Sequence, residues 1–519
     1  MLRKTLLLFS SMLMLVVSSL LSLGVIEILL RKIDGYPLLP LTLGAMPQPQ
    51  KALTSHISLR DYLKEIPLPD DIDADWFMVN PQPLPSKPAD PFLSFLMDKA
   101  KGTEAYSFGN AMKQINRNFL LNEIQQKGSF YESFIRFPKE TVVFDPCEHS
   151  RHPVYRFPPG VTMPGGLVTN NFGWRGYDLD LNKPPHTIRL CFLGASTTIG
   201  LHSLRYSYPE YIGAWLNIWA QKNKWNVNFE VINAAREGID SSDIAAIFKQ
   251  EVLPLEPDVV IYYEGANQFN FRPLIKNLER IPSQAHYEKQ GFVYRLSTIE
   301  PYSATARRVR ELFERITKTG YGKEPVKPRY VLNTSGGIDM DEPDIARPDL
   351  PLNLSTVLHD LEGIYQQADK IHCSLYLLSF VWLPYDGMAL DPVRHKAIFH
   401  YINTFHWPLR YADFKRLSDF QNAVFKRYAS AHDIHFIDVS GSFPRDPDLF
   451  IDAVHFNEEG TRLQAWIVLQ GIMPEIRKRI ARGELPAPDR EYLTEHPCIR
   501  PGIRNGFSEI LRQIGDMGS

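Results

Sequence analysis

Cysteine is scarce in this sequence, with only four residues, Cys147, Cys191, Cys373 and Cys498, in a chain of 519. None of them forms a CxxC pair, which argues against a structural zinc site. Cys191 and Cys373 fall in predicted core strands and are expected to be buried thiols. Cys147 and Cys498 lie in loop-like segments and are candidates for a disulfide if the chain folds in an oxidising compartment.

An excess of one charge sign is missing as well. The 57 Lys and Arg residues nearly balance the 59 Asp and Glu residues, which leaves a net charge of −2. Since there is neither a basic surplus nor a Lys/Arg block, nucleic acid is not expected as a partner. The sequence also lacks a Walker loop, a dinucleotide-binding fingerprint, an HExxH motif and a Cys/His cluster. We therefore expect no metal and no nucleotide cofactor.

What the sequence does contain is a long apolar run at its N-terminus. Arg3 and Lys4 precede 22 uncharged residues, Thr5–Ile26. A helix of this length spans about 33 Å, enough for the core of a bilayer, and the run is longer than that of a cleaved signal peptide. We expect residues 1–32 to form an uncleaved single-pass membrane anchor, with the rest of the chain outside the cytoplasm, in the periplasm.

Two segments without a regular pattern follow the anchor. Residues 33–90 are rich in proline and are expected to form a partly extended tether. Residues 91–164 are expected to be an accessory region. The stretch NNFGWRG comes next, and its Arg175 has two interpretations, a contact with a substrate or, favoured here, a pair with a carboxylate that fixes this stretch.

From Thr187 onward, predicted strands and helices alternate, as is typical of a mainly parallel sheet covered by helices. We expect a domain over residues 165–483, interrupted by insertions at 268–350 and 384–406 and followed by a tail at 484–519. The five predicted strands are 187–195, 227–235, 258–265, 373–383 and 435–440. The predicted helices are 208–221, 240–253, 354–370, 408–432 and 458–482.

Residues able to perform chemistry follow several of these strands. Ser196 follows the first strand, Gly238 the second and Asn267 the third, and Asp452 and His455 follow the fifth. Because the carboxyl ends of parallel strands meet at one edge of a sheet, we expect these residues to lie together. An imidazole is a natural base for a serine hydroxyl, and a carboxylate can orient that imidazole.

The same set can also stabilise the oxyanion that forms when a serine attacks an ester. The backbone N–H groups of Ser196 and Gly238 and the side-chain amide of Asn267 are the candidate donors. Each residue has a structural interpretation as well: Ser196 can cap the following helix, Gly238 can serve a turn, and Asn267 can bond its own backbone. Likewise, a carboxylate and an imidazole in one turn can be a local cap. The combination favours catalysis.

The order Ser, Gly, Asn and Asp-x-x-His resembles that of the SGNH hydrolase superfamily, the GDSL-type esterases and lipases, over about residues 165–480. The stretch NNFGWRG followed by RLCFLGASTT is similar to a membrane-anchored bacterial branch of that superfamily. The resemblance implies a three-layer α/β/α sandwich of flavodoxin type with a mainly parallel five-stranded sheet.

The resemblance also assigns roles to the residues. It implies that Ser196 is the nucleophile, His455 the base and Asp452 the orienting acid, with Gly238 and Asn267 as oxyanion donors. Two positions depart from the family pattern. The motif GDS reads GAS here, so Ala195 replaces an acid, and the motif GxND reads GANQ, so Gln268 replaces an aspartate.

Three functions are compatible with these residues. The favoured one is a membrane-anchored serine esterase that hydrolyses O-acyl esters, such as acetyl esters of an extracellular polysaccharide or a lipid. The second is an O-acyltransferase, in which the same acyl-enzyme passes its acyl group to a sugar hydroxyl. The third, suggested by Ala195 and Gln268, is a membrane-tethered scaffold whose site is degenerate.

Overall fold

The computed structural model describes residues 2–34, 71–89, most of 152–269, a few of 305–312, 352–385, a few between 390 and 401, and 411–487. The chain forms two compact units. The first comprises Met1–Gln50, Ile275–Leu332 and Pro384–Lys415, and the second comprises Lys51–Leu274, Asn333–Leu383 and Arg416–Ser519. The predicted Cys147–Cys498 disulfide, residues 91–151 of the accessory region and most of insertion 268–350 lie outside the described residues.

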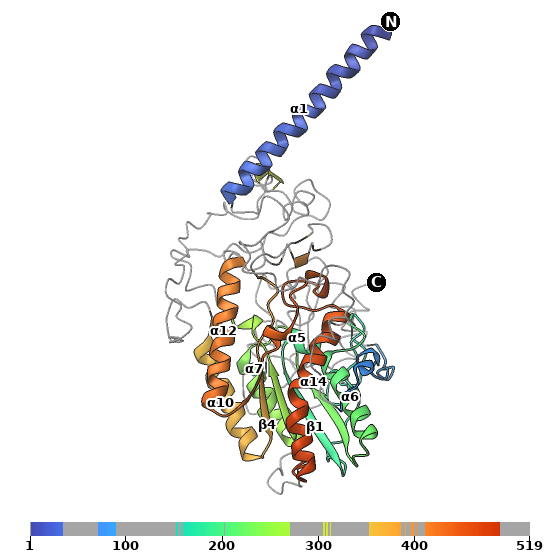
Figure 1. The fold of residues 1–519 in the computed structure, drawn as a ribbon, viewed down its shortest axis with the longest axis vertical. Helices are drawn as coiled ribbons and strands as arrows, with labels where there is room; N and C mark the ends of the chain where they lie inside the picture. The colour runs from blue at the N-terminus through green and yellow to red at the C-terminus, as the bar shows by residue number, and fades with distance from the viewer. Residues whose placement is uncertain are drawn as a thin grey trace, which may run out of the picture. The chain divides into compact units, whose positions relative to one another are not determined.

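The second unit is built on a five-stranded parallel sheet with the order β2-β1-β3-β4-β5 (Figure 1). This is the flavodoxin-like order, and it confirms the prediction of an α/β fold with a mainly parallel sheet. The strands are β1 Thr187–Gly194, β2 Asn228–Asn233, β3 Val259–Tyr263, β4 Ser374–Leu378 and β5 His435–Ile437. Every residue of β1 and β3 is buried, because helices cover both faces of the sheet.

The helices form a layer on each side of the sheet (Figure 1). Helices α6 (Tyr208–Lys222) and α14 (Glu458–Ala481) pack against each other, and so do α7 (Ser241–Ile247) and α10 (Leu354–Lys370). Helix α12 (Tyr411–Ala431) lies beside α10, since the Tyr428 hydroxyl donates to Glu362 over 2.9 Å. Helix α6 begins at a capping box between Ser207 and Glu210, a local signal that fixes its first turn.

Several elements are shorter than predicted. The strand predicted over 435–440 ends at Ile437, and a short helix, α13 (Val439–Ser442), follows it. The helix predicted over 240–253 ends as α7 at Ile247 and continues as a wider turn, Phe248–Val252, and a 3-10 turn, Leu253–Leu255; the proline at 254 has no N–H to continue an α-helix. The strand predicted over 373–383 ends at Leu378. Ser379 N–H still donates to the Ile437 carbonyl of β5 over 3.0 Å, but from Phe380 on the buried chain bonds other groups, and Leu383 N–H donates to the Ala453 carbonyl over 2.9 Å.

Part of the segment predicted as a tether packs on the second unit. Phe77 is only 2% exposed and lies against the indoles of Trp215 and Trp466, with ring centroids 6.2 Å and 5.6 Å away. The Trp219 indole donates to Asp71 over 2.8 Å, which fixes the start of the packed segment. Aromatic side chains bury large apolar areas, so residues 71–89 are part of the domain, although proline content alone placed them in the tether.

The first unit contains helix α1, which runs from Leu2 to Asp34. Large apolar side chains are exposed along it, among them Met14, Leu20, Leu21 and Ile33. Within the residues that the structure describes, no helix combines the length and the apolar character needed to cross a membrane. The membrane span predicted over residues 1–32 is therefore not shown by the structure.

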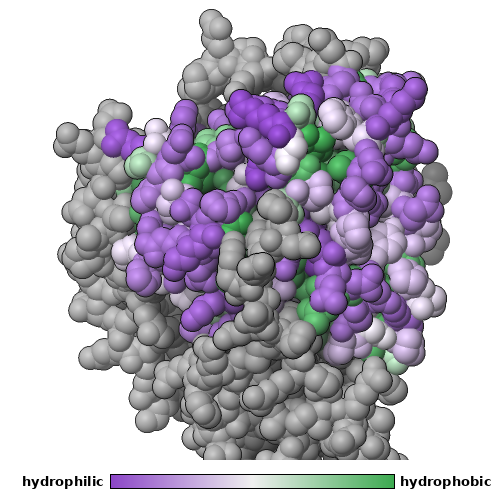
Figure 2. All heavy atoms as spheres, turned by 90° about the horizontal axis from the view of Figure 1, so that it is seen from below, coloured by the Kyte–Doolittle hydropathy of each residue, from purple (hydrophilic) through white to green (hydrophobic). Residues whose placement is uncertain are grey.

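The surface of the second unit is mostly polar. Figure 2 shows one face of the molecule, on which hydrophilic side chains predominate and apolar ones appear as small separate patches. In the described part of this unit, the exposed large apolar side chains are Met78, Val79, Tyr177 and Ile451. Scattered apolar residues of this kind are normal on a face in contact with water.

Candidate active site

Ser196 is held at the carboxyl edge of the sheet by a tight turn. It opens the short helix α5 (Ser196–Ile199), two residues after the end of β1. A Cβ on Gly194 would collide with the Thr198 hydroxyl and the Tyr263 carbonyl, so the close approach of these groups requires glycine. The Thr198 hydroxyl donates to that carbonyl over 3.0 Å and ties the turn to the end of β3.

The structure brings Ser196, His455 and Asp452 into one hydrogen-bonded chain. The Nε2 atom of His455 lies 2.8 Å from the Ser196 hydroxyl, and its Nδ1 lies 2.7 Å from Asp452 Oδ2. The second carboxylate oxygen, Oδ1, accepts the N–H groups of Val454 and His455 over 2.9 Å and 2.8 Å. Asp452 therefore caps its own turn and orients the imidazole at the same time, so the two interpretations of this turn are not exclusive.

The electrostatics of the pair suit a base. Burial alone lowers the pKa of His455, but the charge and the hydrogen bond of Asp452 outweigh it, and the pKa is raised above its usual value. Burial raises the pKa of Asp452, but the imidazole and the two backbone N–H groups outweigh this effect and lower that pKa. An ionised Asp452 beside a partly buried imidazole favours the imidazolium form of His455.

Further polar contacts fix the turn that contains Ser196 and the chain that follows it. The Asn233 amide, at the end of β2, donates to the Thr198 carbonyl and to the Ser207 hydroxyl, both over 3.2 Å. Arg175 is 2% exposed and lies 3.3 Å from the Glu210 carboxylate, and it also donates to the Leu204 carbonyl over 2.9 Å. Arg175 thus pairs with a carboxylate, as favoured from the sequence.

The two candidate oxyanion residues lie on neighbouring loops. Gly238 has φ = 63°, a left-handed conformation that favours glycine, so the turn interpretation of this residue is correct whatever else it does. The Asn267 amide donates to the Ile239 carbonyl over 2.9 Å and so links its own loop to the residue after Gly238. A primary amide carries two N–H donors, so among the described residues this bond leaves Asn267 one N–H for a ligand.

Ser196 does not serve as the cap of the helix that follows β1, which was the structural alternative for this residue. The cap of α5 is Ala195, and the Ser196 hydroxyl bonds His455. Likewise, the Asn267 side chain bonds the neighbouring loop and not its own backbone. The two family departures, Ala195 and Gln268, are both buried.

Glu264 is a site residue that the sequence interpretation missed. It follows β3, is 1% exposed, and its Oε1 accepts the Asn267 N–H over 2.8 Å. Burial raises the pKa of Glu264 to about 7, although the N–H groups of Asn267, Gly265 and Ala266 and the charge of His455 act in the opposite direction. The only sequence signal was an acidic residue at the end of an otherwise apolar strand.

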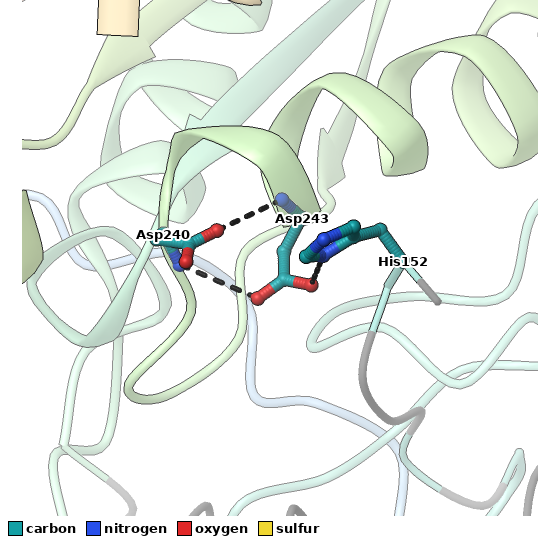
Figure 3. A group of neighbouring side chains, drawn as sticks. All are labelled: His152, Asp240 and Asp243. Carbon is teal, nitrogen blue, oxygen red and sulfur yellow. Dashed lines mark hydrogen bonds and ion pairs between the residues drawn. The ribbon is translucent and has the colours of Figure 1, made fainter. Parts of the chain in front are cut away.

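One further cluster contains potential metal ligands. His152, Asp240 and Asp243 offer ligand atoms that all lie within 4.8 Å of one another (Figure 3). However, Asp240 and Asp243 form the capping box of α7, and His152 Nδ1 lies 2.7 Å from Asp243 Oδ1. Two ligands of a tetrahedral zinc ion, each about 2.0–2.1 Å from it, would lie farther apart than this. The cluster is therefore arranged as a helix cap with a His–Asp hydrogen bond.

Comparisons with known proteins add structural neighbours but no family. No protein-family model and no curated protein matches the chain. Among solved structures, it is similar to the acetylxylan esterase Axe2 from Geobacillus stearothermophilus, with 15% identity over 56% of this chain and 94% of Axe2 and a TM-score of 0.29. It is also similar to LAE5, an alpha/beta hydrolase enzyme from the metagenome of Lake Arreo, with 16% identity over 55% and 95% of the chains and a TM-score of 0.28.

The buried carboxyl of Glu264 predicts a pH dependence of stability. The pKa of Glu264 is about 7 in the folded protein, against 4.5 for an exposed glutamate. Between these two pH values the folded state binds a proton that the unfolded state has lost, so the free energy of unfolding falls as the pH rises through this interval. At about 1.4 kcal/mol per unit, the loss is about 3 kcal/mol. We expect Glu264→Gln to resemble the parent near pH 5 and to be more stable than the parent at about pH 8.

Denaturant unfolding of both proteins at several pH values measures this difference. All other titrating groups are common to both proteins. The pH dependence that is specific to Glu264 is therefore the change with pH in the difference between their free energies of unfolding. Curves that run parallel from acid to alkaline pH would contradict the raised pKa.

Proposed function

We propose that this protein is a serine hydrolase that cleaves carboxylic esters through an acyl-enzyme on Ser196. The observation that carries the proposal is the continuous hydrogen-bonded chain from the Ser196 hydroxyl through His455 to Asp452, with distances of 2.8 Å and 2.7 Å. A serine hydroxyl is a weak nucleophile unless a base takes its proton, and this arrangement provides both the base and a carboxylate that orients it.

The proposed reaction has two halves. In the first, His455 Nε2 takes the hydroxyl proton while Ser196 Oγ bonds the ester carbonyl carbon, and the carbonyl oxygen becomes an oxyanion. The imidazolium then gives its proton to the leaving alcohol as the C–O bond breaks, which leaves an acyl group on Ser196. In the second half, His455 takes a proton from water, the resulting hydroxide bonds the acyl carbon, and the acid leaves as Ser196 regains its proton.

Oxyanion stabilisation is assigned to three donors: the backbone N–H groups of Ser196 and Gly238 and the second N–H of the Asn267 amide. The support is the link between the two loops, since Asn267 is bonded to the carbonyl of Ile239, next to Gly238. Donors fixed in advance stabilise a developing charge more strongly than mobile water does, because they need no reorganisation.

For the substrate, we propose short acyl esters, and acetyl esters of a polysaccharide as the natural class. Acyl transfer to a sugar hydroxyl uses the same acyl-enzyme, but the insertion expected to bind the sugar lies mostly outside the described residues. A degenerate scaffold is disfavoured because neither Ala195 nor Gln268 interrupts the chain of hydrogen bonds from Ser196 to Asp452.

Replacement of the nucleophile tests the proposal. Ser196→Ala is expected to lower kcat for a short-chain nitrophenyl ester by about three orders of magnitude or more, because no other group can form the acyl-enzyme. The matched control is Ser242→Ala, which removes a serine hydroxyl that bonds Asp360 over 2.9 Å and is expected to leave activity near that of the parent. Equal activity of Ser196→Ala and the parent would refute the assignment.

We also propose that the N-terminal segment attaches the chain to a membrane, with the hydrolase unit outside the cytoplasm. The support is the uncharged run Thr5–Ile26 in the sequence and the exposed apolar side chains of α1, such as Leu20 and Leu21. The full chain is expected in the membrane fraction of lysed cells and a chain without residues 1–32 in the supernatant. A full chain that stays in the supernatant would contradict this part.

A further inference from the structure

We propose that Glu264 is the positioning residue of the oxyanion hole: its buried carboxylate gathers the backbone N–H groups of residues 265–267 and thereby aims the Asn267 side chain. The inference rests on the proposed function, because it assigns Asn267 the oxyanion role. Glu264 itself acts through Asn267 and is not assigned a contact with the substrate.

The first support is the way in which the turn after β3 folds around the carboxylate. Oε1 of Glu264 accepts the Asn267 N–H over 2.8 Å, and the N–H groups of Gly265 and Ala266 also face the carboxylate. Three consecutive N–H groups that converge on one anion form a concave anion site of the kind made by successive backbone amides. The bond to Asn267 N–H fixes the start of the side chain that reaches the Ile239 carbonyl.

The second support is that the turn has no room for a different arrangement. A Cβ on Gly265 would collide with the Gln421 amide and with the ring of Phe380, so the backbone lies directly against α12 and the chain after β4. Asn267 is held from the other side by the Ile239 carbonyl. The turn is therefore confined by α12, by the chain after β4 and by the Ile239 carbonyl, and the Glu264 carboxylate binds its backbone N–H groups on the remaining side.

The third support is that one oxygen of this carboxylate makes no hydrogen bond to the described residues. Among the described residues, Glu264 Oε2 is buried and has no hydrogen-bond partner. A buried unsatisfied oxygen on an ionisable group costs free energy, and a glutamine would avoid the part of that cost that comes from burying a charge. A carboxylate kept at such a position is typical of functional sites, where stability is reduced in favour of a fixed geometry or charge.

The carboxylate also acts on the base at a distance. Glu264, Asp452 and Glu237 are the acidic groups that raise the pKa of His455, and the titratable groups near Glu264 are His455 and the hydroxyls of Tyr262 and Tyr263. Removing the Glu264 charge takes away one of the influences that favour the imidazolium. The pH below which His455 is protonated and inactive therefore shifts to a lower value.

Two substitutions separate the acceptor oxygen from the charge. Glu264→Leu removes both and is expected to lower kcat by about 10²-fold or more, as loss of one oxyanion donor does. Glu264→Gln keeps an oxygen for the Asn267 N–H and removes only the charge, so it is expected to remain within about tenfold of the parent. The acid limb of its kcat/KM profile is expected to move to lower pH.

A double-mutant cycle shows whether Glu264 acts through Asn267. If it does, Glu264→Leu combined with Asn267→Ala is no slower than Asn267→Ala alone, because the positioned group is already gone. Multiplying effects would overturn the proposal, and so would a Glu264→Leu variant as fast as the parent. Asp258→Asn, at the opposite end of β3 and fully buried, is the control for a general loss of packing, and thermal unfolding is recorded for every variant.

Failure of the proposed function would look different. In that case the parent itself does not hydrolyse esters, whereas the positioning role is still measurable as amide hydrogen exchange in the peptide that contains residues 265–267. Faster exchange there in Glu264→Leu than in Glu264→Gln supports the positioning role, and equal exchange in the parent and both variants overturns it.

Discussion

The parallel alignment of five strands is the constraint on which the site depends. Ser196 and His455 are 259 residues apart in the chain, yet their side chains lie 2.8 Å from each other. Only the shared direction of the strands makes this possible, because every strand then delivers its following loop to the same edge. The sheet and its helices supply a rigid frame, and the residues of the proposed triad lie on short turns at that edge.

Three largely buried ionisable side chains lie at this edge of the sheet. The charge of His455 lowers the pKa of both Asp452 and Glu264, and all three side chains are removed from most of the water. Burial opposes ionisation, but backbone N–H groups and opposite charges compensate for it to different degrees. Asp452 stays ionised, His455 is biased toward the imidazolium, and Glu264 is left with a pKa raised to about 7. The same surroundings thus lower the pKa of Asp452 and raise the pKa of His455 and Glu264.

Much of the fold follows from periodic sequence patterns, and the departures have physical causes. The alternation of apolar strands and amphipathic helices predicts the sheet and its order of elements, and the helix at Leu354–Lys370 agrees with its predicted ends. The fourth strand was predicted too long because residues 380–383 are apolar and buried, although the N–H groups of Phe380 and Leu383 bond groups outside the sheet. Phe77 packs into the domain from a proline-rich segment, where no periodic pattern exists to reveal it.

The site divides in the same way. The order Ser, Gly, Asn and Asp-x-x-His in the sequence predicts which residues lie at the sheet edge, but the distances and the bond between Asn267 and Ile239 come only from the structure. Glu264 was not predicted, since its burial and the conformation of the turn that follows it become visible only in the structure. The predicted roles of Gly238 and Asn267 as oxyanion donors stay predictions that activity measurements decide.

The most direct test of the central claim is covalent labelling of the native protein with a fluorophosphonate, followed by peptide mass spectrometry. Such probes react with serine hydroxyls that an adjacent base activates. The account predicts a single adduct on Ser196, formed in the folded protein and lost when the protein is unfolded before labelling. A folded protein that gains no adduct on Ser196, or that is labelled at a different serine, would contradict the account.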